Sequence, residues 1–365
     1  MVEGNRIELT EDEAELYDRQ IRLWGLESQK GLLRAAKVLV IGMSGLGAEV
    51  TKNIVLAGVK SLTMMDGSVA TKEDLCSQFF IPHSELGKNR AEASVERAQQ
   101  LNPMVEVKAV PHYPEKFADE PDFYTKFDIV CATRLDLPTY LKINTICRNA
   151  NVKFFCADVF GTFGYHFSDL QNHEYAEEET KQIAKPVLSS HTPNKRAKME
   201  KEAVKVTVKK TDNFVPLQAV VDMDWKNEET KKKLNEMDSS FFLSMILLSF
   251  RLKQKRDPSP ATREEDIKLL QSIRDEFLTD KSVPLEKVPD ECFRTVFAEV
   301  SPSCAVVGGV LAQEIIKVVS QKGAPHNNLF FFNPLSSCGT VVSLGNIPSQ
   351  NSKQEPVDLI DLDDD

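Results

Sequence analysis

The 365-residue sequence has no Cys-x-x-Cys pair, and its seven cysteines are scattered. Zinc sites and disulfide frameworks need regular cysteine spacing, so we expect neither, and scattered thiols indicate a reducing compartment. No uninterrupted apolar run reaches transmembrane length, and the polar, acidic N-terminus does not resemble a signal peptide, so we expect no membrane association. The net charge of −10 leaves no basic stripe for phosphates, so we expect no nucleic-acid partner.

A glycine-rich turn follows an apolar run near the start of the chain. Residues 38–41 read Val-Leu-Val-Ile, Gly42, Gly45 and Gly47 come next, and a helical pattern begins at once. This order is typical of nucleotide-binding folds, because the N–H groups and dipole of a helix start favour a phosphate. Asp66 ends the next predicted strand, where such folds place a ribose-binding acid.

The spacing of these glycines leaves two interpretations open. It is G-x-x-G-x-G, not G-x-G-x-x-G, and Ser44 replaces the middle glycine of the usual loop. Gly42, Gly45, Gly47 and Asp66 could therefore bind a nucleotide. Alternatively, the glycines serve close helix–sheet packing and Asp66 caps a loop.

Alternating strands and helices predict an α/β, Rossmann-like fold with a mostly parallel sheet covered on both faces. Strands are expected at 38–41, 62–66, 105–110, 128–132, 152–157, 329–332 and 340–344. Helices are expected at 10–24, 28–36, 48–57, 90–101, 137–149, 241–251, 264–277, 291–299 and 305–319.

The pattern breaks after about residue 170, which predicts a discontinuous domain. Its first part is placed at 1–170 and its second at 290–346. An insertion at 171–289 begins with a mobile, charged linker at about 176–203 and continues as a small, mostly helical domain. A flexible acidic tail occupies 347–365.

Six segments together carry a resemblance to the ThiF/MoeB-type adenylating enzymes that activate ubiquitin-like proteins. They are YDRQIRLWG (17–25), VLVIGMSGLGAEV (38–50), GKNRAEASVERAQQLNP (87–103), DVFGTFGY (158–165), AVVGGVLAQEIIK (305–317) and PHNNLFFF (325–332). Within that family the chain most resembles the smaller, non-catalytic subunits of heterodimeric SUMO-activating enzymes, over about residues 11–345.

The resemblance implies a reaction and a set of partners. Such enzymes use ATP and Mg²⁺ to adenylate the C-terminal glycine of a ubiquitin-like protein, and then transfer it to a cysteine as a thioester. The implied partners are the catalytic subunit, SUMO and, through the complex, the SUMO-conjugating enzyme. The catalytic subunit would bind most of the ATP and Mg²⁺. The resemblance further implies a nuclear location and no zinc on this chain.

The chain departs from active family members at the positions that would handle ATP. Residues 75–79 read Leu-Cys-Ser-Gln-Phe and lack the phosphate-facing arginine, and Arg90 takes the place of the catalytic lysine. Leu135 falls where a magnesium-binding aspartate is expected, with Asp136 one position along, and no cysteine has the setting of the thioester nucleophile. The resemblance therefore implies that the chain's own loop is inactive.

Arg19 and Arg22 lie three residues apart, so they share a face of the predicted helix. They could be a solvated helix face, but an arginine presented in this way also suits a phosphate across an interface. The resemblance implies that Arg19 reaches the partner's ATP near its terminal phosphates, and that Arg22 is structural. We therefore expect Arg19 to act in trans.

Two charged segments have alternative interpretations. Val357, Leu359 and Ile360, flanked by acids, resemble a SUMO-interaction motif that adds a strand to its partner, or they belong to a solvating acidic tail. Residues Lys195–Lys198 read Lys-Arg-Ala-Lys, either a short nuclear-import signal or a solvated cluster of charge.

Two other functions stay open. The chain could be a self-sufficient, homodimeric ThiF/MoeB-like adenylyltransferase, which tight ATP binding by the isolated chain would reveal. It could also be the matching subunit of the NEDD8-activating enzyme. That subunit carries a much larger insertion than residues 171–289, which argues against it.

Overall fold

The computed structural model describes residues 15–26, 28–29, 35–187, 198–335 and 337–345. Several predicted features lie outside the described residues: the helix start at 10–13, most of the helix at 28–36, residues 195–197 of the basic cluster, and the tail with Val357, Leu359 and Ile360.

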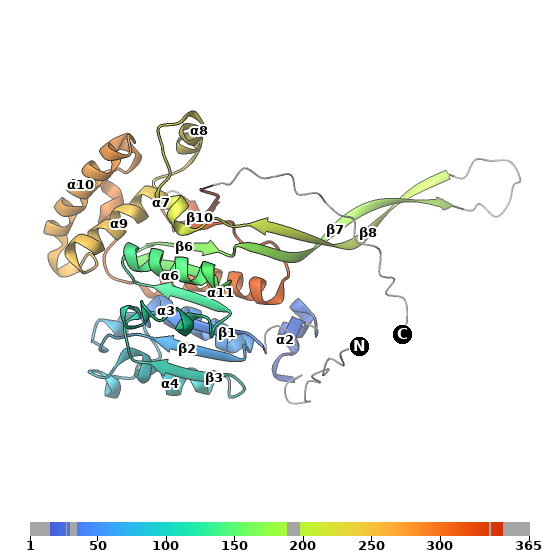
Figure 1. Ribbon diagram of the computed structural model, residues 1–365, viewed down its shortest axis with the longest axis horizontal. Coiled ribbons are helices and arrows are strands. Elements are labelled where there is room, and N and C mark those ends of the chain that lie inside the picture. Colours follow the sequence, from blue (N-terminus) through green and yellow to red (C-terminus); the bar gives the residue numbers. More distant parts are fainter. Residues whose placement is uncertain (1–14, 27, 30–34, 188–197, 336, 346–365) are drawn as a thin grey trace, which may run out of the picture.

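One eight-stranded sheet forms the centre of the molecule, in the order β10-β9-β6-β5-β4-β1-β2-β3 (Figure 1). The strands β1 to β5 run parallel, as predicted, and β6, β9 and β10 extend the sheet antiparallel. The bounds are β1 Lys37–Ile41, β2 Ser61–Met65, β3 Glu106–Val110, β4 Ile129–Thr133, β5 Lys153–Phe160, β6 Phe163–Asp169, β9 Leu329–Asn333 and β10 Ser337–Val342.

Side chains of β1 alternate between two apolar layers, as expected for a sheet covered on both faces. Val38 and Val40 pack with α3 (Gly45–Ala57), α4 (Arg90–Leu101) and α11 (Ser301–Ser320). Leu39 and Ile41 face the opposite layer, which includes α6 (Leu137–Asn149) and α9 (Ser240–Gln254). The predicted α/β, Rossmann-like class is therefore confirmed.

Shorter helices and turns complete the described chain. The remaining α-helices are α2 Asp18–Trp24, α5 Pro121–Tyr124, α7 Leu217–Val221, α8 Glu228–Glu236 and α10 Arg263–Asp280. The 3₁₀ turns are η2 Asp74–Cys76, η3 His83–Glu85, η4 Pro114–Phe117, η5 Pro260–Thr262, η6 Leu285–Lys287 and η7 Asp290–Arg294.

Helix α11 is the one described helix that is long and apolar enough to cross a membrane. It is a core helix, because it packs against α3 and β6 and most of its apolar residues are buried. Helices α9 and α10 match the predicted ones, but the helix predicted at 291–299 is wrong. That segment forms η7 and then an irregular stretch in which Ala298 has a φ of +60°, which a helix does not allow.

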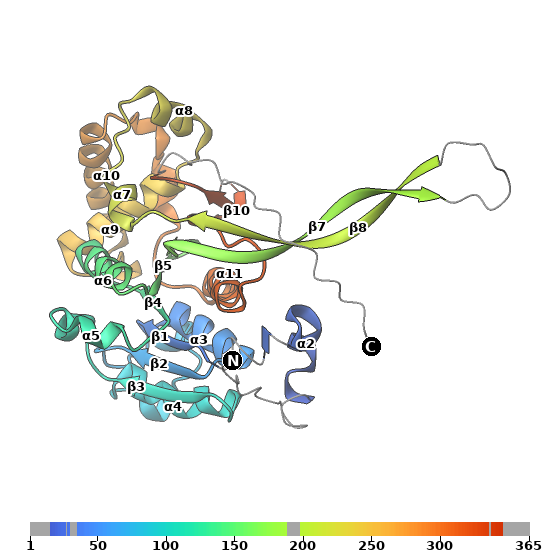
Figure 2. The ribbon, with the colours of Figure 1, turned by 45° about the vertical axis from the view of Figure 1, so that its right-hand side comes forward.

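The segment predicted as a linker forms a long two-stranded ribbon in its described part. Strand β7 (Asn172–Val187) pairs antiparallel with β8 (Lys198–Asn213), and the ribbon projects from the body (Figures 1 and 2). The expectation of an irregular linker at 176–203 is therefore wrong for 176–187 and 198–203. Cross-strand hydrogen bonds and charge pairs hold this polar sequence together, and its apolar alternation begins only at Val204.

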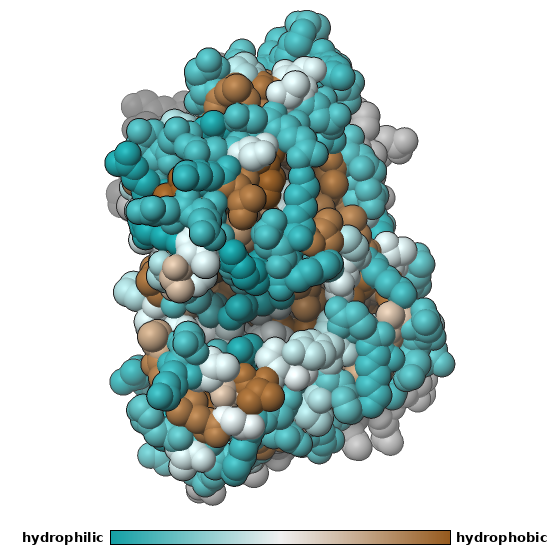
Figure 3. Space-filling model, turned by 90° about the vertical axis from the view of Figure 1, so that its left-hand side faces the viewer, coloured by the Kyte–Doolittle hydropathy of each residue, from teal (hydrophilic) through white to brown (hydrophobic). Residues whose placement is uncertain are grey.

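The two ends of the sheet differ in character. In a parallel α/β sheet, the glycine loop lies at the carboxyl ends of the strands, where such folds bind ligands. Figure 3 shows the molecule from the left-hand side of Figure 1, and the surface on this side is hollowed across its middle. Helix α2 lies at the other end of α3, because Tyr17 is buried against Gly58, the residue that ends α3.

Candidate functional site

The glycines of the loop pack against their own chain. Gly42 has a φ of +87°, and a side chain there would overlap Thr133. A Cβ at Gly47 would overlap the carbonyl of Gly42, and one at Gly45 would overlap the side chain of Ser77. The space beside each glycine is thus filled by protein, as the packing interpretation of these residues requires.

A carboxylate of the chain itself occupies the N-terminus of α3. Glu299 accepts hydrogen bonds from the Ser44 hydroxyl at 2.9 Å, from the Gly45 N–H at 3.1 Å and from the Leu46 N–H at 3.0 Å. The unpaired N–H groups and the dipole of a helix start favour an anion. Here Glu299 supplies that anion, so the position where a Rossmann-like loop would hold a phosphate is already filled.

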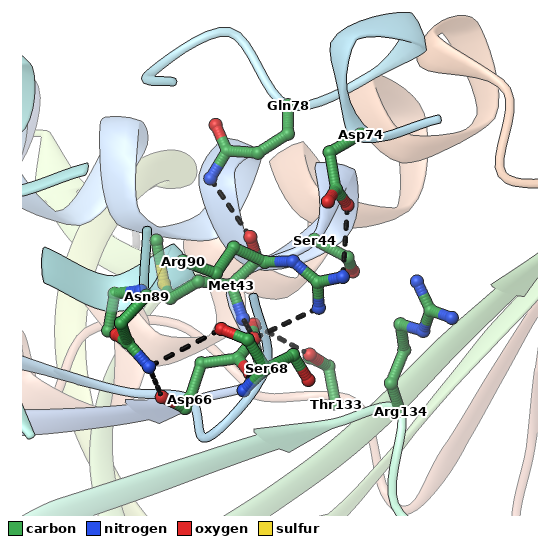
Figure 4. A network of polar contacts seen from close by, with 12 residues as sticks. Met43, Ser44, Asp66, Ser68, Asp74, Gln78, Asn89, Arg90, Thr133 and Arg134 are labelled. Carbon is green, nitrogen blue, oxygen red and sulfur yellow. Dashed lines mark hydrogen bonds and ion pairs between the residues drawn. The ribbon is translucent and has the colours of Figure 1, made fainter. Parts of the chain in front are cut away.

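Arg90 is held between two buried carboxylates (Figure 4). Its guanidinium lies 3.2 Å from Asp66 and 3.1 Å from Asp74. An arginine fixed in this way keeps its charge but cannot turn toward a phosphate without breaking both ion pairs. Arg90, which stands where the resemblance places a catalytic lysine, therefore stabilises the packing of the loop.

Asp66 holds the loop together. It accepts hydrogen bonds from the Met43 N–H at 2.8 Å and from the Ser68 N–H at 2.7 Å, in addition to its ion pair with Arg90. Gln78 fixes the other side of Met43, because its amide donates to the Met43 carbonyl at 2.9 Å. Asp66 thus caps the loop. Both of its carboxylate oxygens already accept hydrogen bonds from this chain, whereas an acid that binds a ribose hydroxyl needs a free oxygen.

A small cavity remains beside this network. Its volume is about 160 Å³, and Asp66, Arg90, Tyr113, Arg134 and Leu135 are among the residues that line it. Pockets for drug-sized ligands measure roughly 300–1,000 Å³. The cavity is therefore too small to enclose a nucleoside triphosphate in this arrangement.

The residues at the expected magnesium position serve α6. Asp136 is the N-cap of this helix, and its side chain accepts from the Thr139 N–H at 3.0 Å. The backbone of Leu135 donates to the Tyr140 hydroxyl at 3.2 Å and accepts from Arg251. Within the described part of the chain, no group of three His, Cys, Asp or Glu could hold a metal ion.

A buried ion-pair network lies behind the loop. Arg251 contacts Asp158 at 2.8 Å and Asp257 at 2.6 Å, and Asp158 also accepts from the hydroxyls of Tyr140 at 3.0 Å and Tyr165 at 2.9 Å. Burial raises the pKa of Asp158, and Arg251 opposes that rise. For Asp257, burial would also raise the pKa, but its arginine neighbours lower it overall. The network joins α9 and the residues after it to the end of β5.

The buried cysteines are poor nucleophiles. Burial raises the pKa of Cys131 to about 12 and raises the pKa values of four others, Cys147, Cys156, Cys292 and Cys304. Because a thioester is formed by a thiolate, a thiol with a raised pKa is inert at neutral pH. Cys76, on η2, is the exposed free cysteine among the described residues.

Arg19 lies far from the loop of its own chain. It is exposed on α2, whereas Arg22 pairs with Asp18 on the same helix at 2.9 Å. Helix α2 is fixed at the C-terminal end of α3 by Tyr17, which contacts Asn102 at 3.0 Å. Since α3 has 13 residues, about 20 Å separates that end from the glycine loop. Arg19 therefore does not belong to the site at the glycine loop of its own chain.

Replacing Glu299 tests how strongly it holds the loop. Glu299→Gln keeps the shape but removes the charge from the helix start and from Arg134, 3.9 Å away. We expect a loss of about 1–2 kcal/mol in the free energy of unfolding. Urea unfolding followed by circular dichroism measures it, with the exposed Glu228→Gln as a control. A stability equal to the unmodified protein would contradict the role of Glu299.

Glu299 is the functional residue that the sequence did not reveal. It lies 255 positions from Ser44, and no local pattern links the two. Arg134 and the Arg251–Asp158 pair were missed for the same reason, because only the folded chain brings them together. Among the described residues, the predicted Gly42, Gly45, Gly47 and Asp66 do converge at one site, whereas Arg19 lies apart.

Comparisons with known proteins agree with the resemblance in the motifs. The model of the ThiF family matches residues 17–354. The chain is 46% identical to SUMO-activating enzyme subunit 1 of Xenopus tropicalis, over 94% of this chain and 99% of that protein. It is 46% identical to the human protein of that name, over 92% and 96%, and 45% identical to the Danio rerio protein, over 91% and 95%.

Proposed function

Because the chain belongs to the ThiF family, we propose that it works in SUMO activation as the non-catalytic subunit of a heterodimer. In this proposal it pairs with a catalytic subunit that binds ATP and Mg²⁺, and it completes that subunit's ATP site. The pair adenylates SUMO and passes it on as a thioester, and it meets the SUMO-conjugating enzyme as a complex. By itself the chain is catalytically inactive.

One observation carries the proposal. The anion position of the chain's own loop is filled by Glu299, and Arg90 is held by Asp66 and Asp74. The residues present therefore do not fit a bound triphosphate. A subunit of this family without a usable nucleotide site of its own acts through the site of another subunit.

Arg19 is the group that this chain would contribute. Adenylation of a carboxylate displaces pyrophosphate, so negative charge on the terminal phosphates must be stabilised. A guanidinium supplied from a neighbouring subunit is suited to this, because it stays protonated and can donate to two phosphate oxygens. Arg19 is exposed at the surface of α2 and can reach across an interface.

The surface around Arg19 supports a partner there. Leu16, Leu23 and Leu26 are 50%, 75% and 41% exposed, and the neighbouring Leu56 of α3 is 43% exposed. The side chain of Gln20 ties α2 to this part of α3 by donating to the Leu56 carbonyl. Clustered exposed leucines mark protein–protein contact sites, since water-exposed apolar area is otherwise kept small.

Three further features belong to the proposal. Val357, Leu359 and Ile360 would bind SUMO by adding a strand to its sheet. Residues 195–198 would direct the protein to the nucleus. The chain would consist of an adenylation-type domain at 1–170 and 290–346, an insertion at 171–289 and a tail from 347.

Co-expression with a SUMO-activating catalytic subunit tests the function. We expect a stable 1:1 complex that forms a SUMO thioester on the catalytic subunit, whereas neither chain alone does so. A homodimer of this chain that adenylates a ubiquitin-like protein without a partner would contradict the proposal. Pairing with a NEDD8-activating subunit in place of the SUMO one would also contradict it.

A further inference from the structure

We propose that the β7–β8 ribbon is an arm that binds the catalytic subunit into which Arg19 reaches. The contact is made by the side of the ribbon that carries Val204, Val206 and Val208, which we call the inner face. This inference rests on the proposed function and adds a second contact surface to it. The occupant of the face is that partner subunit, and the contact surface is centred on Val204, Val206 and Val208 of β8.

One row of side chains on β8 is apolar and lies outside the described apolar clusters, and its partners across the ribbon are the charged Glu177, Glu179 and Lys181. Val204, Val206 and Val208 alternate with the exposed residues Lys205, Thr207 and Lys209. None of these valines belongs to the described apolar clusters. A two-stranded ribbon cannot bury such a face by itself, and isolated ribbons are marginally stable in water. The half-buried valines therefore leave apolar area that a partner can cover.

The same face is buried where the ribbon meets the body. His173 and Tyr175 are 3% and 6% exposed, and Tyr175 pairs with Lys210 in the register of the ribbon. Two residues further along β7, Glu177 pairs with Val208, so that valine continues the buried face outward. With about 3.4 Å per residue, each 16-residue strand spans roughly 50 Å, far beyond the edge of the body.

The base of the ribbon adjoins the surface proposed to receive the partner. At the base of the ribbon, Ala176 exchanges backbone hydrogen bonds with Gln321 and Gly323 at the end of α11. The adjacent Lys322 lies against Gly25, which ends α2. In both ribbon views, α2 and the ribbon lie on the same side of the molecule (Figures 1 and 2). A subunit bound at α2 therefore lies beside the ribbon.

Charge on the inner face is partly compensated within the ribbon. Lys210 contacts Glu177 at 2.8 Å and Glu179 at 2.7 Å. The acids beside Val206 and Val208 thus share one counter-ion, so neither is an isolated charge, and the pair keeps one net negative charge. A protein surface that is apolar opposite the valines and polar at its rim suits this mixture better than a small charged ligand does.

The test compares two faces of one strand in the full-length chain. The variant Val204→Thr, Val206→Thr, Val208→Thr keeps β-branched side chains but removes apolar area. Its control changes the opposite face, with Lys205→Gln, Thr207→Ser and Lys209→Gln. Titration into the catalytic subunit measures both dissociation constants. We expect the valine variant to bind about tenfold more weakly and the control to bind as the unmodified chain does.

Hydrogen–deuterium exchange of residues 203–210 is the second readout. We expect slower exchange when the catalytic subunit is added. Equal dissociation constants for the unmodified chain and the valine variant would contradict the proposal that the ribbon binds the catalytic subunit. A second outcome would also contradict it: residues 203–210 are already protected from exchange in the isolated chain, and removal of residues 347–365 abolishes that protection. The tail of this chain would then occupy the inner face. If the unmodified chains do not pair at all, the proposed function itself fails.

Discussion

Arg19→Ala lowers ATP–pyrophosphate exchange by the assembled pair about 10²–10³-fold while the two chains remain bound, if Arg19 stabilises the partner's phosphates. The size follows from removing one charged donor from a developing anion in a dry site. We expect binding to be retained because the exposed leucines in and beside α2 and at the end of α3, and not Arg19, would supply the apolar contact. SUMO-dependent pyrophosphate exchange, measured at saturating concentrations of both subunits, gives the result.

Arg22→Ala is the matched control for Arg19. It lies on the same helix, but it already pairs with Asp18 at an exposed site, so we expect little change in exchange. Arg19→Lys separates charge from geometry, because a lysine keeps the charge but loses the two-pronged donor. Unchanged exchange in Arg19→Ala would remove Arg19 from the reaction.

Arg251→Met destabilises the protein by about 3–5 kcal/mol, because it leaves the buried Asp158 without its cation. Asp158 keeps the hydroxyls of Tyr140 and Tyr165, but these do not neutralise a buried carboxylate. Urea unfolding followed by circular dichroism measures the loss.

Lys253→Met on the same helix is the control for Arg251. Its ion pair with Glu276 is exposed, so we expect a change below about 1 kcal/mol. The double variant Asp158→Asn, Arg251→Met removes both charges and should recover part of the stability. If Arg251→Met were as stable as Lys253→Met, the buried network would not connect α9 to the sheet as described.

Local patterns predicted the parallel half of the sheet. Val38–Ile41 alternates between two apolar layers, and the strands of β1, β2 and β4 lie within a residue or two of their expected positions. These short apolar runs are buried on both faces, which gives a clear sequence signal. The strand β6 was missed, because it follows β5 after a short turn and continues the same aromatic-rich segment.

Contacts between distant residues explain what the sequence did not reveal. The glycine pattern indicated a phosphate loop, but only the fold brings Glu299 to its helix start. The polar residues of β7 gave no alternation of their own, and their pairing with β8 creates the ribbon. The resemblance to a family implied an inactive loop, and the contacts of Glu299 and Arg90 would give such inactivity a physical cause.

The number of ATP molecules bound by the assembled pair tests the central claim most directly. Isothermal titration of ATP with Mg²⁺ into the purified heterodimer gives this stoichiometry. We predict one ATP per pair, because Glu299 and the Arg90 ion pairs fill the loop of this chain. Two ATP molecules per pair, with one bound at Gly42–Gly47, would contradict the account.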